Sequence, residues 1–187
     1  MSHIVSLVPF PSENIPPLAI SVGIQFLPDN SLGLIYTIQG DLSQLCVPGL
    51  TIPSRADNLW QHTCFEVFLA TVDSYREINL SPSSQWQAYT FKCYREGSPL
   101  DNIPAPSITS ADSNEIGSGR FVLQAILPPS LLPIRLTRLG LSVVVEERER
   151  GLSYWALCHP GPRPDFHHPD SLAIPFPHPF IPSPYPV

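Results

Sequence analysis

Positive charge is scarce in this 187-residue sequence. Lysine occurs only at Lys92, and 10 Lys and Arg stand against 16 Asp and Glu, which gives a net charge of -6. Proteins that bind nucleic acid through its phosphates need clustered basic side chains. We therefore expect no nucleic-acid partner. Because charged residues make up only 14% of the chain, we expect a packed globular protein rather than a disordered one.

Long apolar runs are absent as well. No stretch approaches the roughly 18 consecutive apolar residues of a membrane helix, so we expect no membrane span. The first residues, MSHIVSLVPFPSENIPP, lack a cationic segment, and Pro9 and Pro11 interrupt their apolar run. Such a segment does not resemble a secretory signal. We therefore expect a cytoplasmic protein.

Motifs for metal binding and catalysis are also missing. The cysteines Cys46, Cys64, Cys93 and Cys158 form no C-x-x-C pair, which argues against a zinc knuckle or a thioredoxin-like site. We expect buried free thiols, although an exported chain could form two disulfides. No phosphate-binding loop and no G-x-S-x-G motif occurs. We therefore expect that the protein has no enzymatic activity. The alternative is a glycosidase that uses a pair of carboxylates such as Glu66 and Glu77.

Prolines are unevenly distributed along the chain. Between Ser54 and Ser98 only Pro82 occurs, whereas many of the 24 prolines follow His159. Because proline lacks a backbone donor, it is excluded from central strands. The middle of the chain is therefore the predicted sheet core. We predict one domain over residues 1–174, followed by an extended proline-rich tail over Pro175–Val187 that packs along the surface or stays loose.

A helical period is lacking, whereas short alternating segments recur between turn residues. The predicted strands are Ile20–Phe26, Leu32–Gln39, Thr63–Ala70, Tyr75–Leu80, Gln85–Tyr94, Arg120–Leu127, Leu139–Glu147, Ser153–Cys158 and Leu172–Ile174. Many short strands at such spacing indicate an all-β sandwich or barrel. The polar stretch Gly97–Gly119 is predicted to be a loop.

The segment NLWQHTCFEVFLA places a carboxylate within a strand that is otherwise apolar. Side chains alternate across a strand, so Phe65 and Val67 share the core face and Glu66 points to the opposite side. Glu77 and Asn79 lie on one face of the next predicted strand. We expect Glu66 and Glu77 to share a sheet face that borders either a ligand cavity or a buried polar network.

A sheet face that mixes aromatic rings with Glu, Asn, Gln and Arg is suited to sugars. Rings stack on the apolar faces of a sugar, and polar side chains bind its hydroxyl groups. The candidate ligand-binding residues are Trp60, Glu66, Glu77, Asn79, Trp86, Tyr89 and Arg95.

Two alternatives need no ligand. The three tryptophans, Trp60, Trp86 and Trp155, could fill the core and donate their indole N–H groups to backbone carbonyls. The two glutamates could belong to a closed network with Arg76, Arg95 or Lys92.

The segments ADNLWQHTCFEVFLA and YREINLSPSSQWQAYTFKCYREG resemble the DOMON-like ligand-binding domains, a group similar to family-nine carbohydrate-binding modules. Their shared elements are W-x-x-x-x-x-E-V-F-L and Y-x-E-I-N-x-S-P-x-x-x-W. The resemblance spans about Leu32 to Gly97 and continues more loosely through LGLSVVVEE, LSYWALCHP and PDFHHPDSLAI. It implies a jelly-roll-like antiparallel β-sandwich that binds carbohydrate or haem and has no catalytic activity.

The resemblance also implies roles for particular residues. In sugar-binding relatives, aromatic rings hold the saccharide beside acidic and amide groups, and Trp60, Trp86, Glu77, Asn79 and Arg95 could play these parts here. Haem-binding relatives use a methionine and a histidine as axial ligands. The only methionine in this chain is Met1, which argues against Met/His ligation and leaves ligation by two histidines open.

A histidine-rich segment, CHPGPRPDFHHPDS, offers His159, His167 and His168 as alternative haem or metal ligands. Adjacent histidines on an extended segment point to opposite sides, so only one of His167 and His168 easily joins a site with His159. The alternatives are a turn in which a histidine donates to a backbone carbonyl, and a histidine that binds a ligand at the rim of the sandwich.

The sequence thus favours a non-catalytic domain that binds a small polar ligand, above all a saccharide, with no cofactor. The second hypothesis is a haem- or metal-binding domain. The third is an interaction module whose proline-rich tail binds a protein partner.

Overall fold

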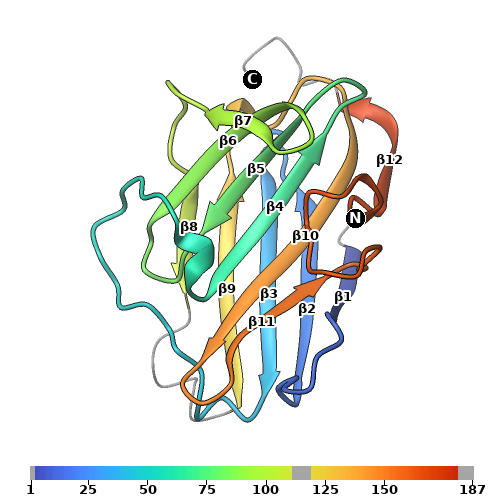
Figure 1. Ribbon diagram of the computed structural model, residues 1–187. Helices are drawn as coiled ribbons and strands as arrows, with labels where there is room; N and C mark the ends of the chain where they lie inside the picture. Colours follow the sequence, from blue (N-terminus) through green and yellow to red (C-terminus); the bar gives the residue numbers. More distant parts are fainter. Residues whose placement is uncertain (1–2, 111–118, 181–187) are drawn as a thin grey trace.

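The computed structural model describes residues 3–110 and 119–180 and is built almost entirely of antiparallel strands (Figure 1). The strands are β1 (His3–Pro9), β2 (Leu18–Phe26), β3 (Leu32–Gly40), β4 (Cys64–Ala70), β5 (Tyr75–Leu80), β6 (Trp86–Cys93), β7 (Glu96–Pro99), β8 (Ser107–Ser110), β9 (Arg120–Leu127), β10 (Leu136–Glu147), β11 (Gly151–Ala156) and β12 (Ile174–Phe180). Short 3-10 helices occur at η1 (Leu59–Gln61), η2 (Pro129–Leu131) and η3 (Pro169–Ser171). The prediction of an all-β antiparallel sandwich is confirmed.

Two sheets form the layers of the sandwich. The first sheet has the strand order β1-β2-β3-β9-β8, and the second has the order β7-β6-β5-β4-β10-β11. Strand β1 links them, because His3 to Leu7 pair with β2 whereas Val8 and Pro9 pair with β11. In Figure 1 the second sheet lies in front of the first.

Alternation along the central strands explains why the sheets stack. Phe65, Val67 and Leu69 of β4 are fully buried on the face that meets the first sheet, where Tyr36 and Phe121 pack against them. The Tyr36 ring lies 5.1 Å from the ring of Phe65, and its hydroxyl donates to the backbone carbonyl of Glu66 at 2.9 Å. This apolar interior removes a large hydrophobic area from water and drives the stacking.

Both faces of β4 are buried, although only one of them meets the other sheet. All of the residues from Cys64 to Ala70 are inaccessible or nearly so. The second buried face is covered by the segment Cys158–Leu172, which crosses in front of β10 (Figure 1). We call this stretch the covering segment. It turns an outer sheet face into a partly enclosed one.

Four segments differ from the sequence-based predictions, and the first is β1, for which no strand was predicted. The predicted loop Gly97–Gly119 contains most of β7 and all of β8, which pair with β6 and β9 at the sheet edges. These strands are short and polar, so they lack the alternation of a half-buried strand. The last predicted strand, Leu172–Ile174, instead begins at Ile174 and continues as β12.

The proline-rich tail is also in part a strand. Residues 174–180 pair with the Leu136–Leu139 stretch of β10, with Pro175 opposite Arg138. In the described sheet order β12 pairs with β10, and no strand pairs with its other edge. Prolines are tolerated at such an edge because they have no backbone N–H to donate. The rest of the predicted tail, residues 181–187, lies outside the described residues, and the boundary at 174 stays a prediction.

Two further predictions concern cysteines and membranes. All four thiols are free, but only Cys64 is buried, whereas Cys93 is exposed and the other two are intermediate. The expectation of buried thiols is therefore correct for Cys64 alone. Within the described residues, no helix has both the length and the apolar character needed to cross a membrane.

Candidate functional site

The inner face of the second sheet is lined by apolar side chains, whereas its outer face also carries polar ones. The pairing register aligns Glu66 of β4 with Asn79 of β5 and Ser142 of β10. The next row along the same face places Phe68 beside Glu77. Glu66 and Glu77 therefore share one sheet face, because they occupy diagonal positions on neighbouring strands.

The covering segment approaches this face closely at a glycine. A side chain on Gly140 of β10 would place its Cβ 2.7 Å from Leu172 and 3.2 Å from the Cβ of Phe68. The absence of a side chain lets Leu172 pack on Phe68 in a small apolar cluster with Ala70. This cluster fixes one end of the covering segment on the sheet.

Trp60 reaches the same face from η1, between β3 and β4. Asn58 precedes the 3-10 turn with φ 62°, a left-handed conformation that asparagine tolerates. The turn carries Trp60 with 42% of its surface exposed. An exposed indole ring next to a hollow offers a flat stacking surface.

The turn between β6 and β7 brings in Arg95, which has a left-handed φ of 58°. Gly97 follows and pairs with Phe91 across the turn. A Cβ at Gly97 would lie 2.6 Å from the carbonyl oxygen of Thr90 and would collide with the Phe91 ring. A glycine is therefore required here for Phe91 to keep its place.

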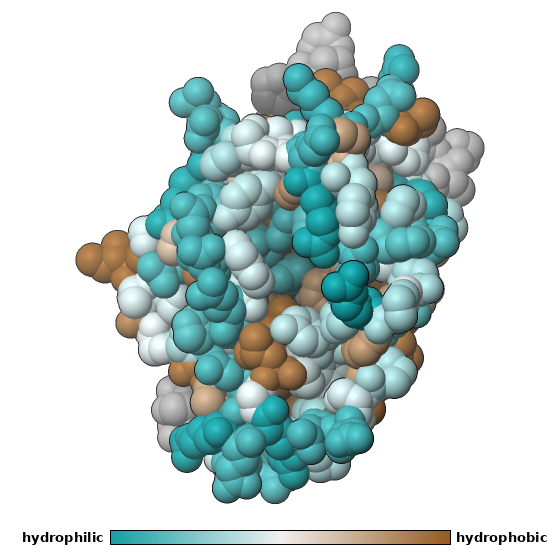
Figure 2. Space-filling model, viewed as in Figure 1, coloured by the Kyte–Doolittle hydropathy of each residue, from teal (hydrophilic) through white to brown (hydrophobic). Residues whose placement is uncertain are grey.

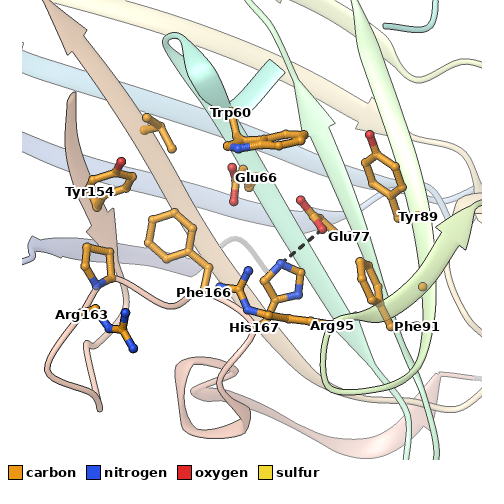
Figure 3. Close-up of a pocket in the computed structure, with 13 residues that line it drawn as sticks. Trp60, Glu66, Glu77, Tyr89, Phe91, Arg95, Tyr154, Arg163, Phe166 and His167 are labelled. Carbon is orange, nitrogen blue, oxygen red and sulfur yellow. Dashed lines mark ion pairs between the residues drawn. The ribbon is translucent and has the colours of Figure 1, made fainter. Parts of the chain in front are cut away.

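Together these elements enclose a cavity of 560 Å³. Figure 2 shows a hollow near the middle of this face with hydrophilic atoms at its bottom. The labelled side chains of Figure 3 surround it, from Tyr154 and Arg163 on one side to Tyr89 and Phe91 on the other. The lining residues are Trp60, Glu66, Glu77, Tyr89, Phe91, Arg95, Gly97, Val144, Tyr154, Arg163, Pro164, Phe166 and His167. Aromatic rings thus form the walls and carboxyl groups lie among them.

Glu66 is buried, with only 3% of its surface exposed, yet it lines the cavity. The hydroxyl of Ser142 donates to its Oε2 at 3.2 Å. Burial, and then the nearby carboxyl group of Glu77, raise the pKa of Glu66 well above its ordinary value. Both causes disfavour the charged form of this side chain.

Glu77 is the second buried carboxyl group at the cavity. The amide Nδ2 of Asn79 donates to its Oε1 at 2.9 Å. Burial raises the pKa of Glu77 from 4.5 to about 6, although the hydrogen bond from Asn79 and the charge of Arg95 oppose the increase. At neutral pH Glu77 is therefore mostly ionised. Asn79 is 1% exposed, and its Oδ1 has no hydrogen-bond donor within the described part of the chain.

His167 comes from the covering segment and lies against the rings of Phe68, Tyr75 and Phe91 in edge-on contacts. Its Nδ1 lies 2.9 Å from the hydroxyl of Tyr75, which also accepts the backbone N–H of Arg95 at 3.0 Å. When Tyr75 donates its proton to Nδ1, the proton of the imidazole is on Nε2. This nitrogen lies 3.6 Å from Oε2 of Glu77 (Figure 3).

Burial, followed by the charge of Arg95, lowers the pKa of His167 to about 4. The imidazole is therefore neutral at neutral pH. It fills the edge of the cavity as a ring and a hydrogen-bond donor rather than as a cation.

Asp165 ties the covering segment to the turn after β6. Its Oδ1 accepts from Arg95 Nη2 at 2.9 Å, and its Oδ2 accepts from the hydroxyl of Tyr94 at 2.6 Å. Partial burial raises the pKa of Asp165, but these two hydrogen bonds, the charge of Arg95 and the backbone N–H of His167 together lower it. The ion pair between Arg95 and Asp165 thus holds the covering segment to the turn at the rim of the cavity. It also fixes the position of the Arg95 guanidinium.

The structure separates the sequence-predicted site residues into two groups. Trp60, Glu66, Glu77, Tyr89 and Arg95 line the cavity. Asn79 does not line the cavity, but its amide donates to Glu77. Trp86 is 4% exposed and belongs to the core between the sheets, where the guanidinium of Arg55 lies 4.7 Å from its ring centroid. Trp86 therefore does not reach the cavity.

The two alternatives without a ligand, tryptophans in the core and a closed network of glutamates, have different outcomes. Trp155 fills the core, but its indole N–H donates to the Ser153 hydroxyl at 3.0 Å rather than to a carbonyl. Arg76 donates to the carbonyl of Ser130, and Arg95 pairs with Asp165. Within the described residues, neither these arginines nor Lys92 forms an ion pair with Glu66 or Glu77. The glutamates therefore do not form the closed network of salt bridges that was considered.

The three histidines of the covering segment have different partners and do not gather at one site. Nε2 of His159 lies 3.0 Å from the Val8 carbonyl, and Nδ1 of His168 accepts from the backbone N–H of Asp170 at 3.2 Å. Only His167 lines the cavity. Across residues 3–110 and 119–180, no group of three or more His, Cys, Asp and Glu side chains is placed to hold a metal ion.

Comparisons with known proteins concern mainly the fold. No protein-family model matches the sequence, and no curated protein matches it. A similar solved structure is the crystal structure, at 2.70 Å, of a Bacteroides uniformis protein proposed to bind carbohydrate. The two structures superpose with a TM-score of 0.63 over 90% of this chain and 83% of that chain, at 12% sequence identity. At this identity the likeness shows a shared fold.

Sequence reasoning missed several cavity residues. Tyr154, Arg163 and Phe166 line the cavity from β11 and the covering segment. Tyr154 alternates with the core residue Trp155, so its outward position follows from the strand pattern. Phe166 lies within a loop, and no local period indicates which way a loop residue points.

Proposed function

We propose that the cavity binds a small saccharide or a sugar-bearing metabolite and that the protein has no catalytic role. The observation that carries this proposal is the meeting of aromatic rings with buried hydrogen-bonding groups in one cavity of 560 Å³. Small-ligand sites commonly have volumes of about 300–1,000 Å³. A monosaccharide or a disaccharide fits this range.

The chemistry of the walls supports a sugar over an apolar ligand. Trp60 and Tyr154 offer flat faces for the C–H groups of a pyranose ring. Glu66 and Glu77 offer acceptors to its hydroxyl groups, and His167 offers a donor. An apolar ligand would leave these polar groups buried and unpaired, which costs free energy.

The placement of the carboxyl groups supports binding rather than hydrolysis. A glycosidase holds its two carboxylates about 5–10 Å apart on opposite sides of the scissile bond. Glu66 and Glu77 lie side by side on one sheet face, so they do not face each other across a ligand. The likeness to a protein proposed to bind carbohydrate agrees with a binding role.

The DOMON-like resemblance, with its jelly-roll-like topology, belongs to this proposal as well. It supplies the expectation that a β-sandwich of this kind binds carbohydrate or haem on or between its sheets. In the cytoplasm, where we propose that the protein acts, a soluble sugar is a more accessible ligand than an extracellular polymer.

Isothermal titration calorimetry with a panel of neutral and charged mono- and disaccharides tests the proposal. We expect at least one sugar to bind the wild type and to bind Trp60→Ala at least about tenfold more weakly, because a stacking face is lost. Trp86→Phe is the matched control, since Trp86 lies in the core and a phenylalanine retains most of its apolar packing there. Failure of every sugar to bind the folded wild type would refute the proposal.

A further inference from the structure

The buried side chains in and next to the cavity wall include more hydrogen-bond acceptors than donors. Glu66, Glu77 and Asn79 together present four carboxyl oxygens and one amide oxygen. Within the described residues, the side-chain donors that reach them are the Ser142 hydroxyl, to Glu66 Oε2 at 3.2 Å, and the Asn79 amide, to Glu77 Oε1 at 2.9 Å. Within the described part of the chain, Asn79 Oδ1 is buried and accepts no hydrogen bond, and the hydrogen bond to the Glu66 carboxyl group goes to Oε2, although these residues are only 1% and 3% exposed.

The charge of Arg95 acts on both glutamates, but among the described residues no arginine or lysine forms an ion pair with them. Arg95 donates to Asp165 at 2.9 Å and to the Tyr94 hydroxyl at 3.2 Å, so its guanidinium is engaged at the rim. His167 is 3.6 Å from Glu77 and is neutral at neutral pH, as described above. Arg163 is exposed and lies on the opposite side of the cavity from Glu77 (Figure 3). Among residues 3–110 and 119–180, neither carboxyl group has an arginine or lysine in contact.

A buried carboxylate without a counter-ion is costly, and a ligand can supply what is missing. An ammonium group carries three N–H donors and one positive charge. Hydroxyl groups supply donors but leave the negative charge uncompensated. The rings of Trp60 and Phe166, which border the same space, attract cations through their faces.

We propose that the ligand of this cavity is an amine-bearing saccharide whose ammonium group lies between the carboxyl groups of Glu66 and Glu77. This inference rests on the proposed function and narrows it to one chemical class. The sugar ring lies against the aromatic walls, and the ammonium group provides both the missing donors and the missing charge.

Calorimetry at pH 7 with glucosamine, glucose and N-acetylglucosamine tests the inference, because these sugars share a ring and differ at C2 in carrying an ammonium, a hydroxyl or an acetamide group. We expect glucosamine to bind at least about tenfold more tightly than glucose, the difference that one good ionic hydrogen bond provides. N-Acetylglucosamine carries the same nitrogen at C2 without the positive charge. We therefore expect it to bind no more tightly than glucose.

Variants connect the preference to the two glutamates. Glu66→Gln/Glu77→Gln keeps the shape of both side chains and removes their charge, so we expect the ratio of the glucosamine to the glucose affinity to fall to about one, on the scale of a single ion pair. Glu146→Gln is the control, because Glu146 pairs with His62 at 2.8 Å and does not line the cavity. This control is expected to keep the wild-type ratio.

The outcomes separate this inference from the proposed function. Tighter binding of glucosamine that disappears in the double variant supports both. Equal or tighter binding of the neutral sugars, or a preference for glucosamine that survives in the double variant, overturns the inference and leaves sugar binding standing. If no sugar of this set or of the wider panel binds the folded wild type, both are overturned.

Discussion

The two faces of strands β4, β5 and β6 are covered in different ways. On the inner face, Phe65, Ile78 and Trp86 pack against the first sheet in a mainly apolar core. On the outer face, Glu66 and Glu77 lie beneath loops and border a cavity of 560 Å³. The inner face stabilises the fold. The outer face holds carboxyl groups that are costly to bury and that can form hydrogen bonds to a ligand.

The largest expected contrast comes from two tryptophans on opposite sides of this sheet. Trp86→Ala removes a large core side chain and is expected to lower the free energy of unfolding by about 3–5 kcal/mol. Trp60→Ala is expected to lower it by less than about 1 kcal/mol, because Trp60 is 42% exposed. Urea denaturation measures both values. Equal losses would show that the outer face is part of the core.

His167 tests how the covering segment responds to acid. Its pKa is lowered from 6.5 to about 4 in the folded protein. Neutral His167 therefore contributes stability above about pH 6.5, and this contribution is lost as the pH falls through about 4. The raised pKa of Glu77 acts in the opposite direction, because its contribution is present below pH 4.5 and lost as the pH rises through about 6.

The effect of His167 is the larger of the two, so His167→Gln is expected to be less sensitive to acid than the wild type. Between pH 7 and pH 4 the difference in unfolding free energy between the two proteins should change by roughly 3 kcal/mol. Denaturation at a series of pH values measures it. His62→Gln is a control, because His62 lies away from the cavity with 62% of its side chain exposed. A parallel pH profile for His167→Gln would contradict burial of this imidazole.

Gly97→Ala is expected to have an intermediate effect on stability and a clear effect on binding. The added methyl group collides with Phe91 and the Thr90 carbonyl, and such overpacking costs about 1–3 kcal/mol. Because Phe91 forms a wall of the cavity, saccharide affinity should fall as well. Gly49→Ala is a matched control, since no atom lies within 4 Å of a Cβ at Gly49. Wild-type affinity in Gly97→Ala would show that Phe91 is not part of the site.

The smallest effects are expected from two serines on opposite faces. Ser142→Ala removes the hydroxyl that donates to Glu66, and Ser153→Ala removes the acceptor of the Trp155 indole. Each loss of a buried hydrogen bond is expected to cost about 1 kcal/mol of stability. Only Ser142→Ala should alter saccharide affinity. A change in affinity with Ser153→Ala would mean that the two faces are coupled.

The sequence predicts the strands well where apolar and polar residues alternate. In β4 and β5 alternation places Glu66, Glu77 and Asn79 on one face, and the structure has them there. In β6 alternation separates Trp86 from Tyr89, but both faces carry aromatic rings, so the pattern does not tell which face is the core. The position of Trp86 is decided by packing with the distant first sheet.

Other features depend on contacts between segments far apart in the sequence. The covering segment reaches the outer face because Asp165 binds Arg95 and because Gly140 admits Leu172. No local pattern in a proline-rich loop encodes either contact. Strand β12 escaped prediction for a related reason, because prolines usually argue against a strand and its pairing partner, β10, lies more than thirty residues earlier.

The most direct test of a cavity on the outer face uses the three indole N–H groups as reporters. Trp60 lines the cavity, whereas Trp86 and Trp155 lie between the sheets. In ¹H–¹⁵N correlation spectra recorded during a saccharide titration, with each signal assigned by a Trp→Phe variant, we expect the Trp60 signal to shift with ligand concentration and the other two to stay in place. Movement of the Trp86 or Trp155 signal while that of Trp60 stays fixed would contradict the account.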